Sequence, residues 1–189
     1  PQIRPPVTCE TGTACATDII YLFHYAHATT PRIMGVSDAF DVYYFNDSTD
    51  LWVDTGINVG KKPSMHTFNG ILYIAHGATT LATWDGSSAS TQSIDGTIAP
   101  DVVTECANRL VVNDTSATGL DLICFSKVED ATGWTFTEAG GAVSIRAGYK
   151  DGSSVVGLIK NFMNELIVFK QGERTESIYR IATSGAAYA

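Results

Sequence analysis

The chain has 189 residues with a formal net charge of −8, and 44% of its residues are hydrophobic against 17% charged. It is long enough to bury a sizeable core, and its acidic balance excludes the basic footprint of a typical nucleic-acid-binding protein. Because no run of 18 apolar residues occurs, the sequence predicts no membrane span.

The N-terminal segment 1–30 differs from the rest of the chain. Pro1, Pro5 and Pro6 indicate an extended start, and a continuous apolar run follows over 18–26. Periodicity leaves a strand and a short helix open, and the Ile, Tyr and Phe content favours the strand. We expect this segment either to close a sheet with distant chain or to belong to a neighbouring domain. The Pro1 start and the early end of the last strand unit predict a piece of a longer protein.

Three strands are predicted next, over 32–36, 41–45 and 51–53. The intervening segments 46–50 and 54–56 are rich in Asn, Asp, Ser, Thr and Gly. Such residues favour turns because their side chains bond the local backbone or tolerate left-handed dihedrals. This region is interpreted as a first, divergent copy of the repeat described next.

A repeated unit occupies the remainder of the chain. An apolar run, an Asn, one variable residue and a second apolar run recur over 65–74, 102–112 and 156–169, and a third apolar run follows each, over 81–84, 122–125 and 178–181. In the clearest copy, Asn69-Gly70 separates two apolar runs, which is the strongest short hairpin signal. Repeated units of this size predict an all-β fold, a partial or complete β-propeller built of three- to four-stranded antiparallel blades. The predicted blades are 31–62, 63–99, 100–150 and 151–183.

No strong catalytic, cofactor or metal motif is present, so none of these sites is predicted. His24 and His27 would lie on opposite faces of a strand, which suits one metal poorly. The carboxylates of Asp47, Asp50 and Asp54 lack the frame of a calcium loop and are interpreted as turn residues. No Gly-x-Ser-x-Gly elbow, Walker loop or dinucleotide fingerprint occurs.

Other chemistry-bearing residues are interpreted as structural. A propeller glycosidase needs facing carboxylates, and no such pair is indicated among Glu105, Glu129, Glu138, Glu165, Glu173 and Glu176. The Trp side chains are expected to pack between blades rather than to form a sugar platform, and they are Trp52, Trp84 and Trp134. Cys106 and Cys124 are predicted to be small core residues. Reduced thiols are favoured at Cys9 and Cys15, and a disulfide between them is the alternative.

The third and fourth copies of the unit resemble a known family. Residues 108–112, 122–130 and Trp134 read NRLVV, LICFSKVED and W, and 157–159, 164–170 and 177–181 read GLI, NELIVFK and SIYRI. These motifs are similar to those of phage tail propeller proteins, which include the nozzle, or tail tubular protein B, of short-tailed phages and related tail hub and stopper proteins. The resemblance spans about 63–183 and leaves the first 30 residues unmatched.

This resemblance implies a virion structural protein in the phage tail that forms part of the DNA-ejection channel and is not an enzyme. Its implied partners are further copies of the chain in a ring, expected to be a hexamer, and other tail proteins such as the adaptor and fibres. Genomic DNA would pass without sequence-specific binding, and an acidic wall would not hold phosphate. A non-enzymatic protein- or glycan-binding propeller module is the alternative, and an enzyme on the same fold is a third hypothesis.

Overall fold

The computed structural model describes residues 18–95, 97–116, 119–137, 141–148, 151, 153–160, 165–172 and 176–182. Within these residues the protein is all-β, with four antiparallel sheets in which neighbouring strands follow one another in sequence. Cys9 and Cys15 lie outside the described residues.

The first sheet contains β1 (Ile19–Tyr25), β2 (Arg32–Ser37), β3 (Asp41–Asn46) and β4 (Leu51–Asn58). The second contains β5 (Ser64–Phe68), β6 (Ile71–Ala75), β7 (Thr80–Trp84) and β8 (Ala89–Ser93). The third contains β9 (Val103–Cys106), β10 (Arg109–Asn113), β11 (Leu122–Phe125) and β12 (Val143–Arg146). The fourth contains β13 (Ser153–Lys160), β14 (Leu166–Gly172) and β15 (Glu176–Ile181).

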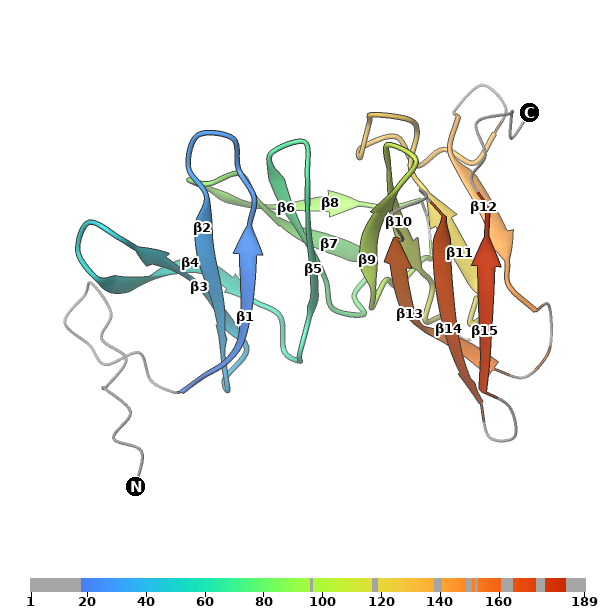
Figure 1. Ribbon diagram of the computed structural model, residues 1–189, viewed down its shortest axis with the longest axis horizontal. Coiled ribbons are helices and arrows are strands. Elements are labelled where there is room, and N and C mark those ends of the chain that lie inside the picture. The colour runs from blue at the N-terminus through green and yellow to red at the C-terminus, as the bar shows by residue number, and fades with distance from the viewer. Residues whose placement is uncertain are drawn as a thin grey trace.

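The four sheets stand side by side in an open series (Figure 1). Their first strands are neighbours, since β1 contacts β5, β5 contacts β9, and β9 contacts β13. The strand predicted in the run 18–26 is confirmed as β1, which pairs antiparallel with β2. The predicted boundary near residue 30 therefore falls inside the first sheet, between its first two strands.

Two-residue hairpins join the first two strands of the second and third sheets. Phe68 pairs with Ile71 across Asn69 and Gly70, whose φ angles are 49° and 78°. In the third sheet the turn residues are Ala107 and Asn108, with φ angles of 53° and 56°. Positive φ at both central residues defines the type I′ turn that suits twisted strands. The predicted Asn69-Gly70 hairpin is confirmed, but Asn108 takes the second turn position whereas Asn69 takes the first.

The hydrophobic core is divided into layers between consecutive sheets. One layer joins the first and second sheets around Met34, Leu72 and Trp84, and the next joins the second and third around Leu81 and Trp134. A further layer joins the third and fourth sheets and includes Cys106, Val111, Leu166 and Val168. Because adjacent sheets share each layer, the packing of one sheet depends on the presence of the next.

The tryptophan prediction is confirmed at two positions. Trp84 and Trp134 are only 2% and 3% exposed. Trp84 stacks on Tyr44 of the first sheet at 5.2 Å between ring centroids, and the Trp134 indole Nε1 donates to the Ala131 carbonyl at 2.7 Å. Neither ring is available as a sugar platform, because such a platform requires an exposed aromatic face. Trp52 is half-buried beside Phe45.

Both described cysteines are buried and form no disulfide, and their burial confirms the prediction that they are small core residues. Cys124 packs between the second and third sheets, and Cys106 packs between the third and fourth. Burial raises the pKa of the Cys124 thiol to about 12. This thiol is therefore protonated and unreactive at neutral pH.

Candidate functional site

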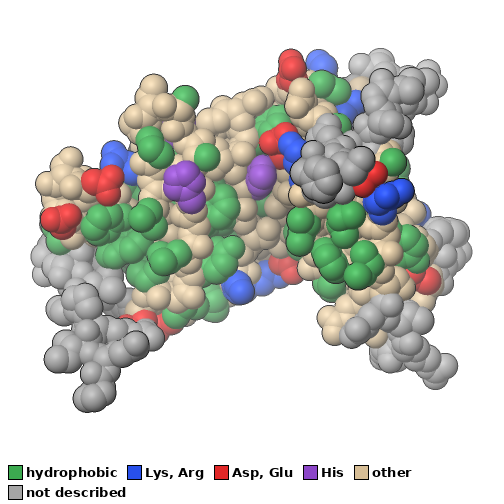
Figure 2. Space-filling view, viewed as in Figure 1, with side chains coloured by type: hydrophobic (Ala, Val, Ile, Leu, Met, Phe, Trp, Pro, Cys, Tyr) green, Lys and Arg blue, Asp and Glu red, His purple; other side chains and the backbone are tan. Residues whose placement is uncertain are grey.

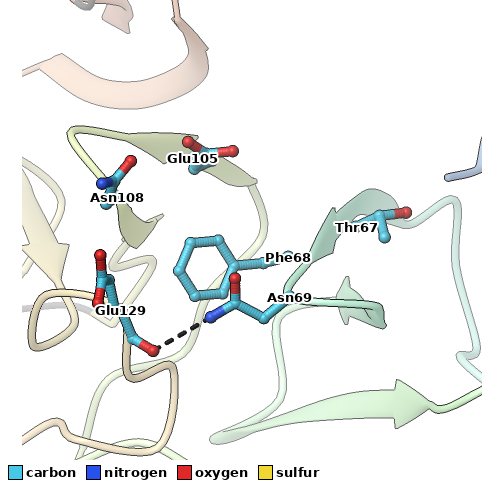
Figure 3. A pocket seen from close by; sticks show the side chains of 6 residues that line it. All are labelled: Thr67, Phe68, Asn69, Glu105, Asn108 and Glu129. Atoms are coloured by element: carbon cyan, nitrogen blue, oxygen red, sulfur yellow. Dashed lines mark hydrogen bonds between the residues drawn. The ribbon is translucent and has the colours of Figure 1, made fainter. Parts of the chain in front are cut away.

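An open pocket lies at the junction of the second and third sheets, and Figure 3 shows its lining. Its volume is about 440 Å³. Three lining residues come from the end of β5 and its turn, one from β9, one from the β9–β10 turn and one from the turn after β11. They are Thr67, Phe68, Asn69, Glu105, Asn108 and Glu129. The floor is the buried Phe68 ring, and the rim residues Asn69, Asn108 and Glu129 are exposed.

Two hydrogen bonds of the Glu129 backbone hold the pocket walls together, and one of them crosses the junction. The Asn69 side-chain Nδ2 donates to the Glu129 carbonyl at 3.1 Å, and the Glu129 backbone N–H donates to the Asn108 carbonyl at 2.7 Å. Glu129 itself has a positive φ of 59°. Its backbone is therefore fixed against both hairpins while its carboxylate remains at the rim.

A row of polar side chains crosses the first strands of three sheets beside the pocket. Lys160 of β13 donates from Nζ to Glu105 Oε1 of β9 at 2.9 Å. On the other side, His66 Nε2 of β5 lies 3.8 Å from Glu105 Oε2. Burial lowers the pKa of His66, against the opposing effect of Glu105, and Lys160 lowers it further. His66 is thus neutral at pH 7, and the ion pair in this row is the one between Glu105 and Lys160.

The lowered pKa of His66 predicts an acid-sensitive contribution to stability. Its folded pKa lies below the unfolded value of 6.5, so the unfolded chain takes up a proton first as the pH falls. The contribution is fully present above pH ~6.5 and declines as the pH drops toward the folded pKa. Between pH 7 and pH 5, the free energy of unfolding should fall less for the His66→Asn variant than for the wild type. Urea denaturation at the two pH values measures this difference.

His24→Asn is the matched control, because His24 is exposed on β1. An equal change of the pH dependence in both variants would contradict the role assigned to His66.

The structure places His24 and His27 in different surroundings. His24 lies on the exposed face of β1, whereas the His27 ring stacks on Tyr25 at 5.6 Å and accepts backbone N–H groups from Thr29 and Thr30 at Nδ1. Among the described residues, no group of three or more His, Cys, Asp or Glu side chains is placed to hold a metal ion. The described part of the chain also contains no helix that could span a membrane.

Asp47 and Asp50 lie in the turn between β3 and β4, whereas Asp54 lies within β4, so the turn predicted over 54–56 is wrong. Asp54 Oδ1 accepts the backbone N–H of Gly56 at 2.8 Å, and Asn46 Oδ1 accepts that of Ser48 at 3.0 Å. Such local bonds are what Asx turns make, and the one at Asp54 lies where the pairing of β3 with β4 is irregular. Asp47 and Asp50 are exposed.

Sequence reasoning missed the convergence of Glu105 and Glu129 in one pocket. It named both residues and indicated no facing pair among the glutamates. The sequence predicted Asn69 and Asn108 as turn residues. Nothing in it indicated that Glu129, in the turn after β11, would form hydrogen bonds with both. Of the other named glutamates, Glu165 lies opposite Arg180 at 3.7 Å between Oε1 and Nε, and Glu176 begins β15.

No protein-family model matches the chain, and no curated protein matches it significantly. Solved structures share its fold at low sequence identity. The computationally designed Ika4 protein has a TM-score of 0.53 at 13% identity, with 95% of this chain and 99% of that chain covered. BBS1N, solved in complex with ARL6DN, has a TM-score of 0.52 at 14% identity and coverages of 95% and 57%.

Raptor of Chaetomium thermophilum has a TM-score of 0.54 at 11% identity, with 92% of this chain and 17% of that chain covered. This chain thus spans about half of BBS1N and about a sixth of Raptor. At such identities the likeness concerns the fold alone, and function does not follow from fold. The chain shares an all-β arrangement of antiparallel sheets with these three proteins.

Proposed function

We propose that this chain is a non-enzymatic structural protein built on β-propeller blades, and that it forms part of a phage tail of the nozzle or hub type. The observation that carries the structural role is the apolar surface left at both ends of the sheet series. The tail assignment rests on the sequence motifs over 63–183, and the open series of sheets is compatible with it.

The first apolar end lies on β1 and β2, where Ile20, Leu22 and Ile33 are 55%, 61% and 48% exposed. The second lies on β13 and β15, where Val156, Ile159 and Ile178 are 48%, 55% and 70% exposed. Figure 2 displays hydrophobic side chains gathered over both regions. Exposed apolar patches on one face of a sheet are typical of surfaces that associate.

Covering these two faces would complete the propeller. Inside the series, every pair of neighbouring sheets buries an apolar layer. The end faces have the same apolar character, so further sheets, from a longer chain or from another copy, would extend the same packing. In a tail, such copies would form the proposed ring around the DNA channel, with adaptor and fibre proteins as neighbours. The net charge of −8 on each chain would keep the channel wall from binding DNA phosphates.

Native mass spectrometry of the protein from its source tests this proposal. We expect a ring of six or more copies. The variant Leu22→Asp should reduce assembly because it places a charge in the first apolar end. Asp47→Asn is the control, since Asp47 lies in an exposed turn. A wild-type protein that remains monomeric over the whole concentration range would contradict the ring.

The protein-binding module is kept as a second candidate function because of the pocket at Glu129. Its lining of amides and carboxylates suits a polar segment of a protein. A glycan platform on Trp84 or Trp134 is not proposed, since both rings are buried.

A further inference from the structure

The pocket between the second and third sheets offers mainly hydrogen-bond acceptors. The Asn69 Nδ2 donates one hydrogen to the Glu129 carbonyl, and its Oδ1 remains as an acceptor, which Figure 3 shows beside the Phe68 ring. The Glu129 carboxylate lies on the opposite wall next to Asn108. A ligand for this site therefore needs several donors.

The charge of the pocket comes from Glu129. The Glu105 carboxylate is neutralised by Lys160 at 2.9 Å. In the part of the chain that the structure describes, no cation lies within ion-pair distance of the Glu129 carboxylate. Lys127 and Arg109, which lie close to Glu129 or Asn108 in sequence, contact other groups. Lys127 faces Asp130 at 4.0 Å, and Arg109 Nη1 donates to the Ser126 and Gly141 carbonyls at 2.7 and 2.6 Å.

The pocket is also formed before any ligand arrives. Its rim residues belong to two tight hairpins and a third turn that are tied together by the bonds of Glu129. The Phe68 floor is 4% exposed and belongs to the core layer between the second and third sheets. Ligand binding would thus cost little free energy for ordering the protein.

We propose that this pocket binds the guanidinium group of an arginine presented by an extended segment of a protein partner. A guanidinium carries five N–H donors and one positive charge, which suits the amide oxygens of Asn69 and Asn108 and the carboxylate of Glu129. The volume of about 440 Å³ accommodates a whole arginine side chain. This site does not depend on the proposed tail role.

The test is a titration of the protein with N-acetyl-arginine amide, followed by NMR chemical shifts of the backbone amides. We expect saturable shifts concentrated at Asn69, Asn108 and Glu129. The neutral isostere N-acetyl-citrulline amide should bind about tenfold more weakly, because it loses the charge-assisted hydrogen bond to Glu129. The variant Glu129→Gln should weaken arginine binding by about the same factor.

The matched control is Asp50→Asn, which makes the same charge change in an exposed turn residue with a φ of 56°. It should leave arginine binding unchanged, and circular dichroism would establish that both variants are folded. The proposal is overturned if citrulline binds as tightly as arginine, if both variants weaken binding equally, or if shifts do not occur at the pocket. Tighter binding of lysine than of arginine would overturn the guanidinium assignment.

Discussion

Replacing Trp84 by Ala is expected to lower the free energy of unfolding by about 3–5 kcal/mol. Trp84 is 2% exposed at the end of β7. Its ring lies 5.2 Å from the Tyr44 ring and 5.1 Å from the Tyr25 ring, and both partners belong to the first sheet. Truncation would therefore open a cavity between two sheets and remove two aromatic contacts. Urea denaturation followed by circular dichroism measures the change.

Trp52→Ala is the control for this experiment, because Trp52 is half-buried and contacts Phe45 within its own sheet. A smaller loss of about 1 kcal/mol is expected there, since less apolar area leaves water. Equal losses for the two variants would show that Trp84 does not join the sheets as described.

Replacing Asp151 by Asn is expected to cost about 3 kcal/mol, because it leaves the buried ammonium of Lys170 without its counter-charge. The Lys170 side chain is 0% exposed. Its Nζ lies 2.7 and 2.8 Å from the two carboxylate oxygens of Asp151 and also donates to the Ala147 and Gly148 carbonyls. With the charge removed, an amide oxygen and two carbonyls would have to stabilise a dehydrated cation. Urea denaturation at pH 7 measures the loss.

The same pair predicts a pH dependence. The hydrogen bond from Lys170 is the largest cause that lowers the pKa of Asp151, followed by the one from Ser153. Because the folded pKa is depressed, the stabilisation is present above the ordinary carboxyl pKa of about 4 and is lost as the pH falls toward the folded value. Asp151→Asn should remove this part of the acid sensitivity.

The control is Asp47→Asn, an equal charge change at an exposed turn residue. If Asp151→Asn lowered the free energy of unfolding no more than this control, the Asp151 carboxylate would not be the group that stabilises the buried Lys170 charge.

Much of the all-β organisation could be predicted from local sequence. Short apolar runs and the Asn-Gly turn signal involve residues close together in the chain, so they report strands and hairpins directly. The strands predicted over 32–36, 41–45 and 51–53 are found as β2, β3 and β4. The repeat aligned Asn69 with Asn108, yet the type I′ turns place them one position apart. Ala107 fills the first turn position without a sequence signal, because strand pairing imposes its left-handed backbone.

The sequence by itself determined the strands, the Asn69-Gly70 turn and the apolar character of the layers in which Trp84 and Trp134 pack. Only the tertiary structure brought Glu105 to Lys160, 55 residues away, and tied Asn69 to Glu129, 60 residues away. The physical reason is that strand and turn propensities act between neighbours, whereas a pocket between sheets depends on which turns meet when separate sheets pack. The burial of Lys170 also depends on the tertiary structure, because its charge is stable in the core only where the fold places Asp151 beside it.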